Sequence, residues 1–254
     1  MSPVKQHLTL DEKREISRKT IMEASAELFY EKGYQNTTTR DIVKKTGILN
    51  GSLYNRFKSK EEILLNIITD ALQNTLDKCE KVLEEEKNPL IAAVIPSALE
   101  ISLSSRDIKS ASLIYEVHKI WAAVDKYVQM NIEWYSNYLR KFGIEFSNIE
   151  DTEMKMITFL GAIGNICGHY ANGGTYNCDK MLHYLVAYMG ALMGVAVDDV
   201  DGTVRRLTDI ISNYTIVLPT DSNKCNLSSM QIGTTLSCKD SLTRNGKVSL
   251  PGTW

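Results

Sequence analysis

Residues that interrupt helices are scarce in this chain, in which only 5 of the 254 residues are proline and 15 are glycine. Stretches in which Val or Thr alternates with polar residues, as in half-buried strands, are also missing. Ala, Leu, Ile, Glu and Lys, which favour helices, are abundant instead. We therefore predict an all-α protein that is long enough for one large or two modest domains.

Cysteine is also too sparse and too irregularly spaced to form a framework. The five cysteines are Cys79, Cys167, Cys178, Cys225 and Cys238. Their odd number and the lack of CxxC spacing argue against disulfides and zinc knuckles and for a reducing cytoplasm. The polar start, Met1–Lys5, does not resemble a secretory signal. The apolar run Leu185–Val197 is shorter than the roughly 20 residues that a membrane span needs, so we expect no membrane association.

Enzyme motifs are missing as well. The sequence has no Walker loop, Gly-rich dinucleotide turn, HExxH motif or nucleophile–base pairing, so we predict neither an enzyme nor a bound cofactor. One alternative remains an all-α enzyme or metal-binding protein, in which His118, Asp125 and His169 would supply imidazole and carboxylate ligands. A second alternative is a helical dimer that binds only other proteins.

The most informative segment that the chain does contain is Thr38–Phe57, which has the layout of a helix-turn-helix. Thr38, with Asp41 three residues later, predicts a capped helix start. Gly47 predicts the end of that helix, because glycine adopts the left-handed backbone conformation without a steric penalty. Ile48, Leu53 and Phe57 would pack a second helix onto the first. An ordinary helical hairpin would give a similar pattern.

If the second helix enters a DNA major groove, its polar residues face the duplex. Hydroxyl groups and tyrosine commonly contact phosphates, whereas Asn and Arg can bond to base edges. The candidate DNA-binding residues are Thr38, Thr39, Arg40, Asn50, Gly51, Ser52, Tyr54, Asn55, Arg56 and Lys60.

Several motifs in this region, in the same order and at the same spacing, resemble the tetracycline-repressor (TetR) family of regulators. They are Ile21–Phe29 followed by Lys32-Gly33-Tyr34, Thr39–Ile42, Gly47-Ile48 and Leu53–Leu64. The resemblance covers about residues 14 to 65, and it implies that Thr38, Arg40, Ser52, Tyr54 and Lys60 contact DNA. Val43, Thr46, Leu49 and Arg56 depart from the family pattern, which leaves the identity of the base contacts open.

Charge is distributed in the way that this resemblance requires. The chain carries a net charge of −2, but its first 60 residues hold 12 Lys or Arg against 7 Asp or Glu. The first 60 residues therefore have a net charge of +5 and the rest of the chain has −7. This is expected for a DNA-binding domain on a body that does not bind DNA.

The rest of the sequence predicts a helical body and a different C-terminal segment. We expect a three-helix head with the helix-turn-helix over residues 11–60, a larger helical effector-binding and dimerisation domain over 61–217, and a flexible tail over 218–254. The tail is rich in Ser, Thr, Asn and Gly. Helices are expected at about 60–86, 89–104, 107–142 with a break near His118, 150–171, 179–197 and 201–216.

Two of these helices have clusters of small residues. Each glycine inside a helix costs up to about 1 kcal/mol relative to alanine, so the clusters need a reason such as close helix packing. We predict a dimer interface at Gly161, Gly164, Gly168, Ala187, Gly190, Ala191 and Gly194. Packing within one chain, or a wall around a ligand, would explain the same pattern. The resemblance also implies a homodimer, which would match a palindromic double-stranded DNA operator.

The middle helices have aromatic and polar residues one helical turn apart, as in a largely apolar ligand pocket with a few polar groups. Ordinary core packing would give a similar pattern. The candidate ligand residues are Tyr115, His118, Trp121, Asp125, Trp134, Tyr138, Asn165 and His169. The resemblance implies a repressor that a small-molecule effector releases from DNA, by favouring a conformation in which the two heads no longer match adjacent grooves.

Overall fold

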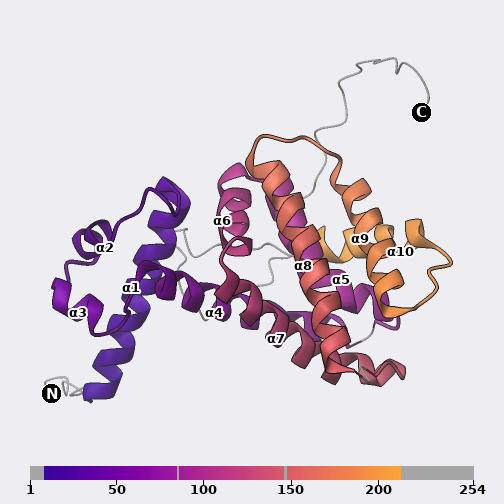
Figure 1. Ribbon diagram of the computed structural model, residues 1–254, viewed down its shortest axis with the longest axis horizontal. Coiled ribbons are helices and arrows are strands. Elements are labelled where there is room, and N and C mark those ends of the chain that lie inside the picture. The colour runs from indigo at the N-terminus through magenta and orange to yellow at the C-terminus, as the bar shows by residue number, and fades with distance from the viewer. Residues whose placement is uncertain (1–8, 85, 146–147, 213–254) are drawn as a thin grey trace, which may run out of the picture.

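The computed structural model of the chain describes residues 9–84, 86–145 and 148–212. Within these ranges it contains ten α-helices, one short 3-10 helix and no strand. This confirms the predicted all-α class. A head of three helices lies at one end of the molecule and a larger helical body at the other (Figure 1). None of the described helices is both long enough and apolar enough to cross a bilayer.

The head forms from local signals that the sequence already contains. It consists of α1 (Leu10–Lys32), α2 (Thr39–Thr46) and α3 (Asn50–Tyr54). Thr38 and Asp41 form a reciprocal capping box at the start of α2. Gly47 ends that helix at φ +69°, with its N–H donating to the carbonyl of Val43. The predicted start and end of α2 are therefore confirmed.

Helix α4 (Lys60–Val82) joins the head to the body. The Ser59 hydroxyl caps its first turn by accepting a hydrogen bond from the N–H of Glu62. Ile63 and Leu64 are buried near its start and Leu76 near its end, and all three belong to one continuous apolar core. Because that core runs along α4, the head and the body share a packed connection. The helix ends four residues earlier than the sequence suggested.

The body is built from the remaining helices. They are α5 (Pro89–Arg106), α6 (Ile108–His118), α7 (Trp121–Leu139) with the 3-10 helix η1 (Arg140–Phe142), α8 (Ile149–Ala171), α9 (Cys178–Met193) and α10 (Val200–Ser212). The predicted break near His118 is present between α6 and α7. The end of the last expected helix and the predicted tail, residues 218–254, lie outside the described residues.

Helix α5 forms the centre of the body. It begins with Pro89 in its first turn, behind an Asn88 cap, and continues through Pro96. Every residue from Leu90 to Leu99 is buried, because α4, α6, α7, α8, α9 and α10 all pack against this helix. The other body helices therefore surround one apolar rod and expose their polar sides to solvent.

Candidate nucleic-acid interface

The two short helices of the head are packed through three side chains that are almost fully buried. Ile42 comes from α2, Leu53 from α3, and Phe57 from the turn after α3, and each is at most 1% exposed. The predicted packing of the second helix onto the first is thus confirmed for Leu53 and Phe57. Since these side chains point inward, the opposite side of α3 faces solvent. Leu49, just before α3, is 79% exposed.

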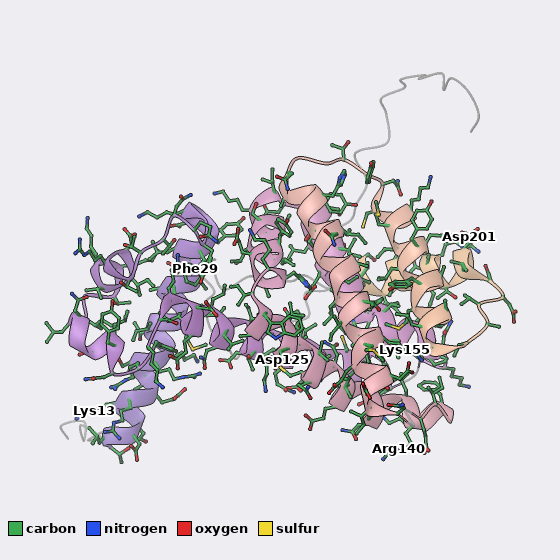
Figure 2. All side chains as sticks on the ribbon, viewed as in Figure 1. Lys13, Phe29, Asp125, Arg140, Lys155 and Asp201 are labelled. Atoms are coloured by element: carbon green, nitrogen blue, oxygen red, sulfur yellow. The ribbon has the colours of Figure 1, made fainter. Side chains whose placement is uncertain are left out.

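The candidate DNA-binding residues lie on or directly beside α2 and α3, the helices at the left in Figure 1 and, in the same view, in Figure 2. Six are exposed, namely Thr38, Arg40, Asn50, Gly51, Tyr54 and Asn55. Four are partly buried, namely Thr39, Ser52, Arg56 and Lys60. The fold therefore brings the start of α2 together with α3. Contact between these residues and DNA remains a prediction.

Two hydroxyl groups link the start of α2 to the end of α3. The Oγ1 atom of Thr39 lies 3.3 Å from the Oη atom of Tyr54. Either hydroxyl can donate the hydrogen bond between them. The proton of the other hydroxyl can then point outward and be donated to an external acceptor, and lone pairs remain free to accept. Neutral hydroxyl donors of this kind suit the non-bridging oxygens of a phosphate.

Lys60 has a structural role that the sequence did not reveal. Its ammonium donates to the carbonyl oxygens of Tyr34 at 2.7 Å and Thr37 at 2.9 Å. It also lies 4.2 Å from the centre of the Tyr34 ring, and burial lowers its pKa. Lys60 thus fastens the loop between α1 and α2, and two of its three N–H donors are already used.

Three basic side chains between residues 38 and 58 are exposed and have no carboxylate partner among the described residues. They are Arg40, Lys44 and Lys58. The neighbouring Lys32 and Lys45 are, by contrast, paired with acidic side chains. Unpaired surface cations are the groups that can replace counterions on a phosphate backbone. Lys44 and Lys58 were missed because a charge count does not distinguish paired from unpaired lysines.

Inside the body, one predicted ligand residue belongs to a closed polar cluster. The Nε2 atom of His118 lies 3.2 Å from Oε2 of Glu100 on α5. The His118 ring meets the ring of Tyr127 edge to face, with centres 5.8 Å apart. Tyr127 is hydrogen-bonded to Glu100, and burial followed by this carboxylate raises its pKa well above the usual value. Glu100 and Tyr127 were not predicted, since neither has a partner close in sequence.

The glycines of α8 make room for this cluster. A Cβ atom at Gly164 would lie 2.7 Å from Cβ of His118, and one at Gly168 would lie 2.8 Å from the Tyr115 ring. Tyr115 and His118 thus pack directly onto the backbone of α8. The two predicted ligand residues on α6 are brought together here, against one side of α8.

Trp134 and Tyr138 form a separate aromatic stack, with ring centres 5.2 Å apart and planes 5° from parallel. The Tyr138 hydroxyl donates to the carbonyl of Leu83, just beyond α4. The indole Nε1 of Trp134 is buried and has no hydrogen-bond partner among the described residues. This stack therefore lies against the end of the tether helix.

The remaining predicted ligand residues lie apart from these two interior clusters. Trp121 is 67% exposed, and Asp125 and Asn165 are exposed as well, so none of the three lines an interior pocket. His169 stacks on Tyr176, with ring centres 3.9 Å apart, and closes the connection from α8 to α9. No three His, Cys, Asp or Glu side chains in the described ranges are placed to hold a metal ion. His118, Asp125 and His169 thus do not meet.

Four of the predicted dimer residues have structural roles within the chain. Gly164 and Gly168 are filled by α6 of the same chain, and a Cβ at Gly190 would lie 2.4 Å from a methyl carbon of Val197. Gly194 is the left-handed residue that ends α9, at φ +66°. Intrachain packing accounts for the first three glycines and helix termination for Gly194, so none of the four needs a dimer interface to explain it. Their place in such an interface stays a prediction.

Gly161, Ala187 and Ala191 lie on a different side of α8 and α9. Gly161 and Ala191 are exposed and Ala187 is partly so. Large apolar side chains accompany them on the two helices, namely Met154, Ile157, Tyr184 and Tyr188, which are 36–56% exposed. The rings of Phe159 and Tyr188 lie 6.1 Å apart, so the two helices lie side by side there. We call this surface the α8–α9 face.

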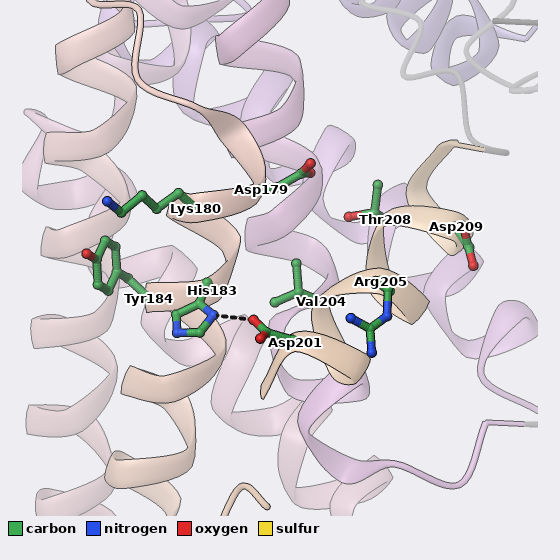
Figure 3. A pocket seen from close by; sticks show the side chains of 9 residues that line it. All are labelled: Asp179, Lys180, His183, Tyr184, Asp201, Val204, Arg205, Thr208 and Asp209. Carbon is green, nitrogen blue, oxygen red and sulfur yellow. Dashed lines mark hydrogen bonds and ion pairs between the residues drawn. The ribbon is translucent and has the colours of Figure 1, made fainter. Parts of the chain in front are cut away.

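A surface groove lies between α9 and α10, at the opposite end of the molecule from the head. It has a volume of about 600 Å³ and is lined by Asp179, Lys180, His183, Tyr184, Asp201, Val204, Arg205, Thr208 and Asp209. Figure 3 shows His183 and Asp201 bridging the two helices, with Nδ1 and Oδ1 3.0 Å apart. Charges of both signs line the groove, so it has no single electrostatic preference.

Comparison with known sequences places a family domain on the head. Residues 21–67 match the family described as bacterial regulatory proteins, tetR family. Over 73 residues the chain is 36% identical to the HTH-type transcriptional repressor KstR2 of Mycolicibacterium smegmatis. The matched stretch makes up 29% of this chain and 36% of that repressor. Over 66 residues it is 29% identical to the fatty acid metabolism regulator protein of Bacillus subtilis. That stretch makes up 26% of this chain and 34% of the regulator. The chain thus matches about a third of the length of these relatives.

Solved structures resemble the chain over more of its length. A TetR-family transcriptional regulator from Syntrophomonas wolfei has 20% identity and a TM-score of 0.51, covering 73% of this chain and 99% of that one. RolR, solved in complex with resorcinol, has 16% identity and a TM-score of 0.55, covering 82% and 99%. At these identities the likeness shows the fold alone.

Proposed function

Because residues 21–67 of this chain match the TetR family of bacterial regulatory proteins, we propose that it is a transcriptional repressor that binds a palindromic double-stranded DNA operator as a homodimer. A small-molecule effector would release it from the operator. In this proposal the protein works in the cytoplasm, has no catalytic role and needs no cofactor.

The observation that carries the proposal is the exposed helix-turn-helix inside the family domain. Tyr54 and Thr39 join their hydroxyl groups beside α3, and Arg40 is exposed and unpaired among the described residues. A helix flanked by neutral donors and free cations suits a major groove bordered by phosphates. Asn50 and Asn55 are exposed on or next to α3 and would bond to base edges.

Selection of random duplex DNA on the purified protein tests this proposal. We expect an enriched palindrome, with log affinity falling steeply as log salt concentration rises, since phosphate contacts release counterions. If no sequence is enriched and no salt-dependent binding is measured, the head is a structural domain without DNA-binding activity. That outcome would favour a helical dimer that binds only protein.

For the dimer we propose the α8–α9 face. Ile157 and Gly161 are one turn apart on α8, and Tyr184 and Tyr188 are one turn apart on α9. Two copies that meet through both helices would form a four-helix interface around a two-fold axis. Such a pair would present two recognition helices about 34–36 Å apart, which is one turn of duplex DNA.

For the effector we propose the interior around Glu100, His118 and Tyr127. Buried, mutually hydrogen-bonded polar groups in an apolar body are where a ligand can be oriented. Tyr115 and His118 pack directly onto the α8 backbone, so an effector that reaches α8 here would have to displace one of them. RolR has a similar fold and is solved with resorcinol, which supports a small-molecule effector here. Its affinity must differ between the DNA-bound and released conformations.

A further inference from the structure

The loop between α1 and α2 lies where three parts of the molecule meet. It leads directly to the Thr38 cap and so sets how α2 begins. Lys60, at the start of the tether helix, holds two of its carbonyl groups. Gln35 in the same loop reaches a body helix, although the chain continues for 81 residues before that partner. The loop is therefore fixed both by the head's own tether and by the body.

The partner of Gln35 is Glu116 near the end of α6. Nε2 of Gln35 donates to Oε2 of Glu116 at 2.8 Å, and the other carboxylate oxygen of Glu116 lies 2.6 Å from Nζ of Lys119. The Glu116 side chain is only 17% exposed. A carboxylate held from both sides is a fixed acceptor, so it restricts where Gln35 can lie.

The other end of α6 contacts the head as well. The ammonium of Lys109 lies 5.3 Å from the centre of the Tyr30 ring on α1. Asp107, the cap of α6, accepts hydrogen bonds from Ser110 and also from the Tyr30 side chain. In spite of burial, these bonds, those from Ser110 first, hold the Asp107 pKa below its usual value. Helix α6 thus contacts the head at both of its ends, and Figure 1 shows it between the head and α8.

The opposite side of α6 is seated in the body. His118 and Tyr115 pack on the α8 backbone with no room for a Cβ atom at Gly164 or Gly168, and His118 bonds to Glu100 on α5. Close-packed contacts transmit a displacement instead of absorbing it. A shift of α6 in the body must therefore move the α1–α2 loop or break the bond between Gln35 and Glu116.

We propose that Glu116 is a positioning residue for DNA recognition: through Gln35 it fixes the α1–α2 loop against the body and so sets the orientation of the helix-turn-helix. The effect on DNA recognition rests on the proposed function, whereas the fixing of the loop does not. It identifies α6 as a direct connection from the interior cluster to the head, in parallel with α4. Either end of that connection can be changed without touching a residue that faces DNA.

The first test uses the full-length protein without DNA. Amide hydrogen exchange would be compared for residues 33–46 in the wild type, Glu116→Ala, Gln35→Ala and Glu116→Gln. The last variant keeps an oxygen acceptor for Gln35. We expect faster exchange in both alanine variants and near-wild-type exchange in Glu116→Gln. Glu133→Ala, which removes an exposed carboxylate on α7, is the matched control and should leave these amides unchanged.

The second test measures the affinity of the same variants for the duplex obtained by random selection. We expect Glu116→Ala and Gln35→Ala each to bind at least about fivefold more weakly, as for a coupling between two sites. The double variant should bind no more weakly than either single variant, because both remove the same contact. Glu116→Gln should restore most of the affinity.

The two tests separate the two hypotheses. If the wild type binds no duplex, the proposed function fails, and the exchange experiment still decides whether Glu116 fixes the loop. If the wild type binds DNA but neither exchange nor affinity changes in the alanine variants, the inference is overturned. Faster exchange with unchanged affinity would also overturn it, since the contact would then be structural only.

Discussion

The hydroxyl oxygens of Thr39 and Tyr54 lie 3.3 Å apart, although fifteen residues separate them in sequence. This contact joins the first turn of α2 to the end of α3, so the two helices share a polar edge as well as an apolar interior. Ile42 and Leu53 form the interior side of the same pair of helices. The orientation of α3 is therefore fixed on both sides.

Replacing Tyr54 by phenylalanine should weaken binding to all duplexes by about fivefold, which corresponds to the loss of one hydrogen bond. The salt dependence should stay the same, because a hydroxyl group carries no charge. Arg40→Ala should instead reduce the salt slope by about one. Fluorescence anisotropy over a salt series measures both effects. Tyr176→Phe, which changes an exposed tyrosine in the body, is the control, and equal losses in both Tyr variants would contradict the docking surface.

Lys60→Met should destabilise the fold, by about 1–2 kcal/mol, because the carbonyl oxygens of Tyr34 and Thr37 lose a charged donor. Lys58→Met provides the comparison, since Lys58 is exposed and unpaired in the described part of the chain. Urea unfolding of both variants measures the difference. If Lys60→Met is as stable as Lys58→Met, the ammonium does not hold the loop in solution.

Gly164→Ala and Gly161→Ala should have opposite effects although they lie one turn apart on α8. A Cβ at residue 164 would lie 2.7 Å from His118, so we expect a loss of about 1–3 kcal/mol. Within one chain a Cβ at residue 161 meets nothing within 4 Å, and alanine should add up to about 1 kcal/mol of helix stability to each subunit. Thermal unfolding at one fixed protein concentration compares them. Similar losses in both would argue against the packing described for α6.

Ile157→Glu should weaken self-association by about tenfold or more, because a charge would be buried between two copies of the α8–α9 face. Sedimentation over a range of concentrations measures this change. Ile108→Glu introduces the same charge at a residue that is 55% exposed at the start of α6, and it should leave the mass unchanged. A dimer that survives Ile157→Glu would have to form through another surface.

Burial raises the pKa of the Cys79 and Cys167 thiols to about 12, from an ordinary value of 9.0. Between these values the unfolded chain loses thiol protons that the folded chain retains, so the folded state should become less stable as the pH rises from 9 to 12. Near neutral pH both thiols should react slowly with iodoacetamide, and Cys178, which is partly exposed, should react faster. Mass spectrometry of the alkylated sites tests the order in which the three cysteines react. Urea unfolding at several pH values tests whether stability falls as the pH rises. Rapid alkylation of Cys79 in the native protein would contradict the expected protection of this thiol by burial. Cys225 and Cys238 lie outside the described residues.

Short-range signals in the sequence predicted the local structure well. Thr38 with Asp41, and Gly47 at the end of the same helix, depend on neighbours within a few residues, so their conformations could be predicted before the fold was known. The break after His118 is similarly local. The family motifs added the three-helix arrangement, which periodicity alone did not distinguish from a helical hairpin.

Interactions between distant residues could not be predicted in the same way. Gly164 and Gly161 look alike in the sequence, but the rotation of α8 turns one toward α6 and the other toward solvent. Glu100 bonds to His118 across two helices, and Gln35 bonds to Glu116 across 81 residues. Residue type shows that such groups can bond, and only the packing of the helices determines which partners they have.

The contacts of Tyr30 and Gln35 with α6 have a consequence for engineering chimeric sensors. Exchanging residues 1–60 for the head of another regulator would keep the covalent junction at α4. It would also place unrelated side chains opposite Lys109 and Glu116. A working graft must therefore carry complementary residues at 30 and 35, or bring its own α6, so the transplantable unit is discontinuous in sequence.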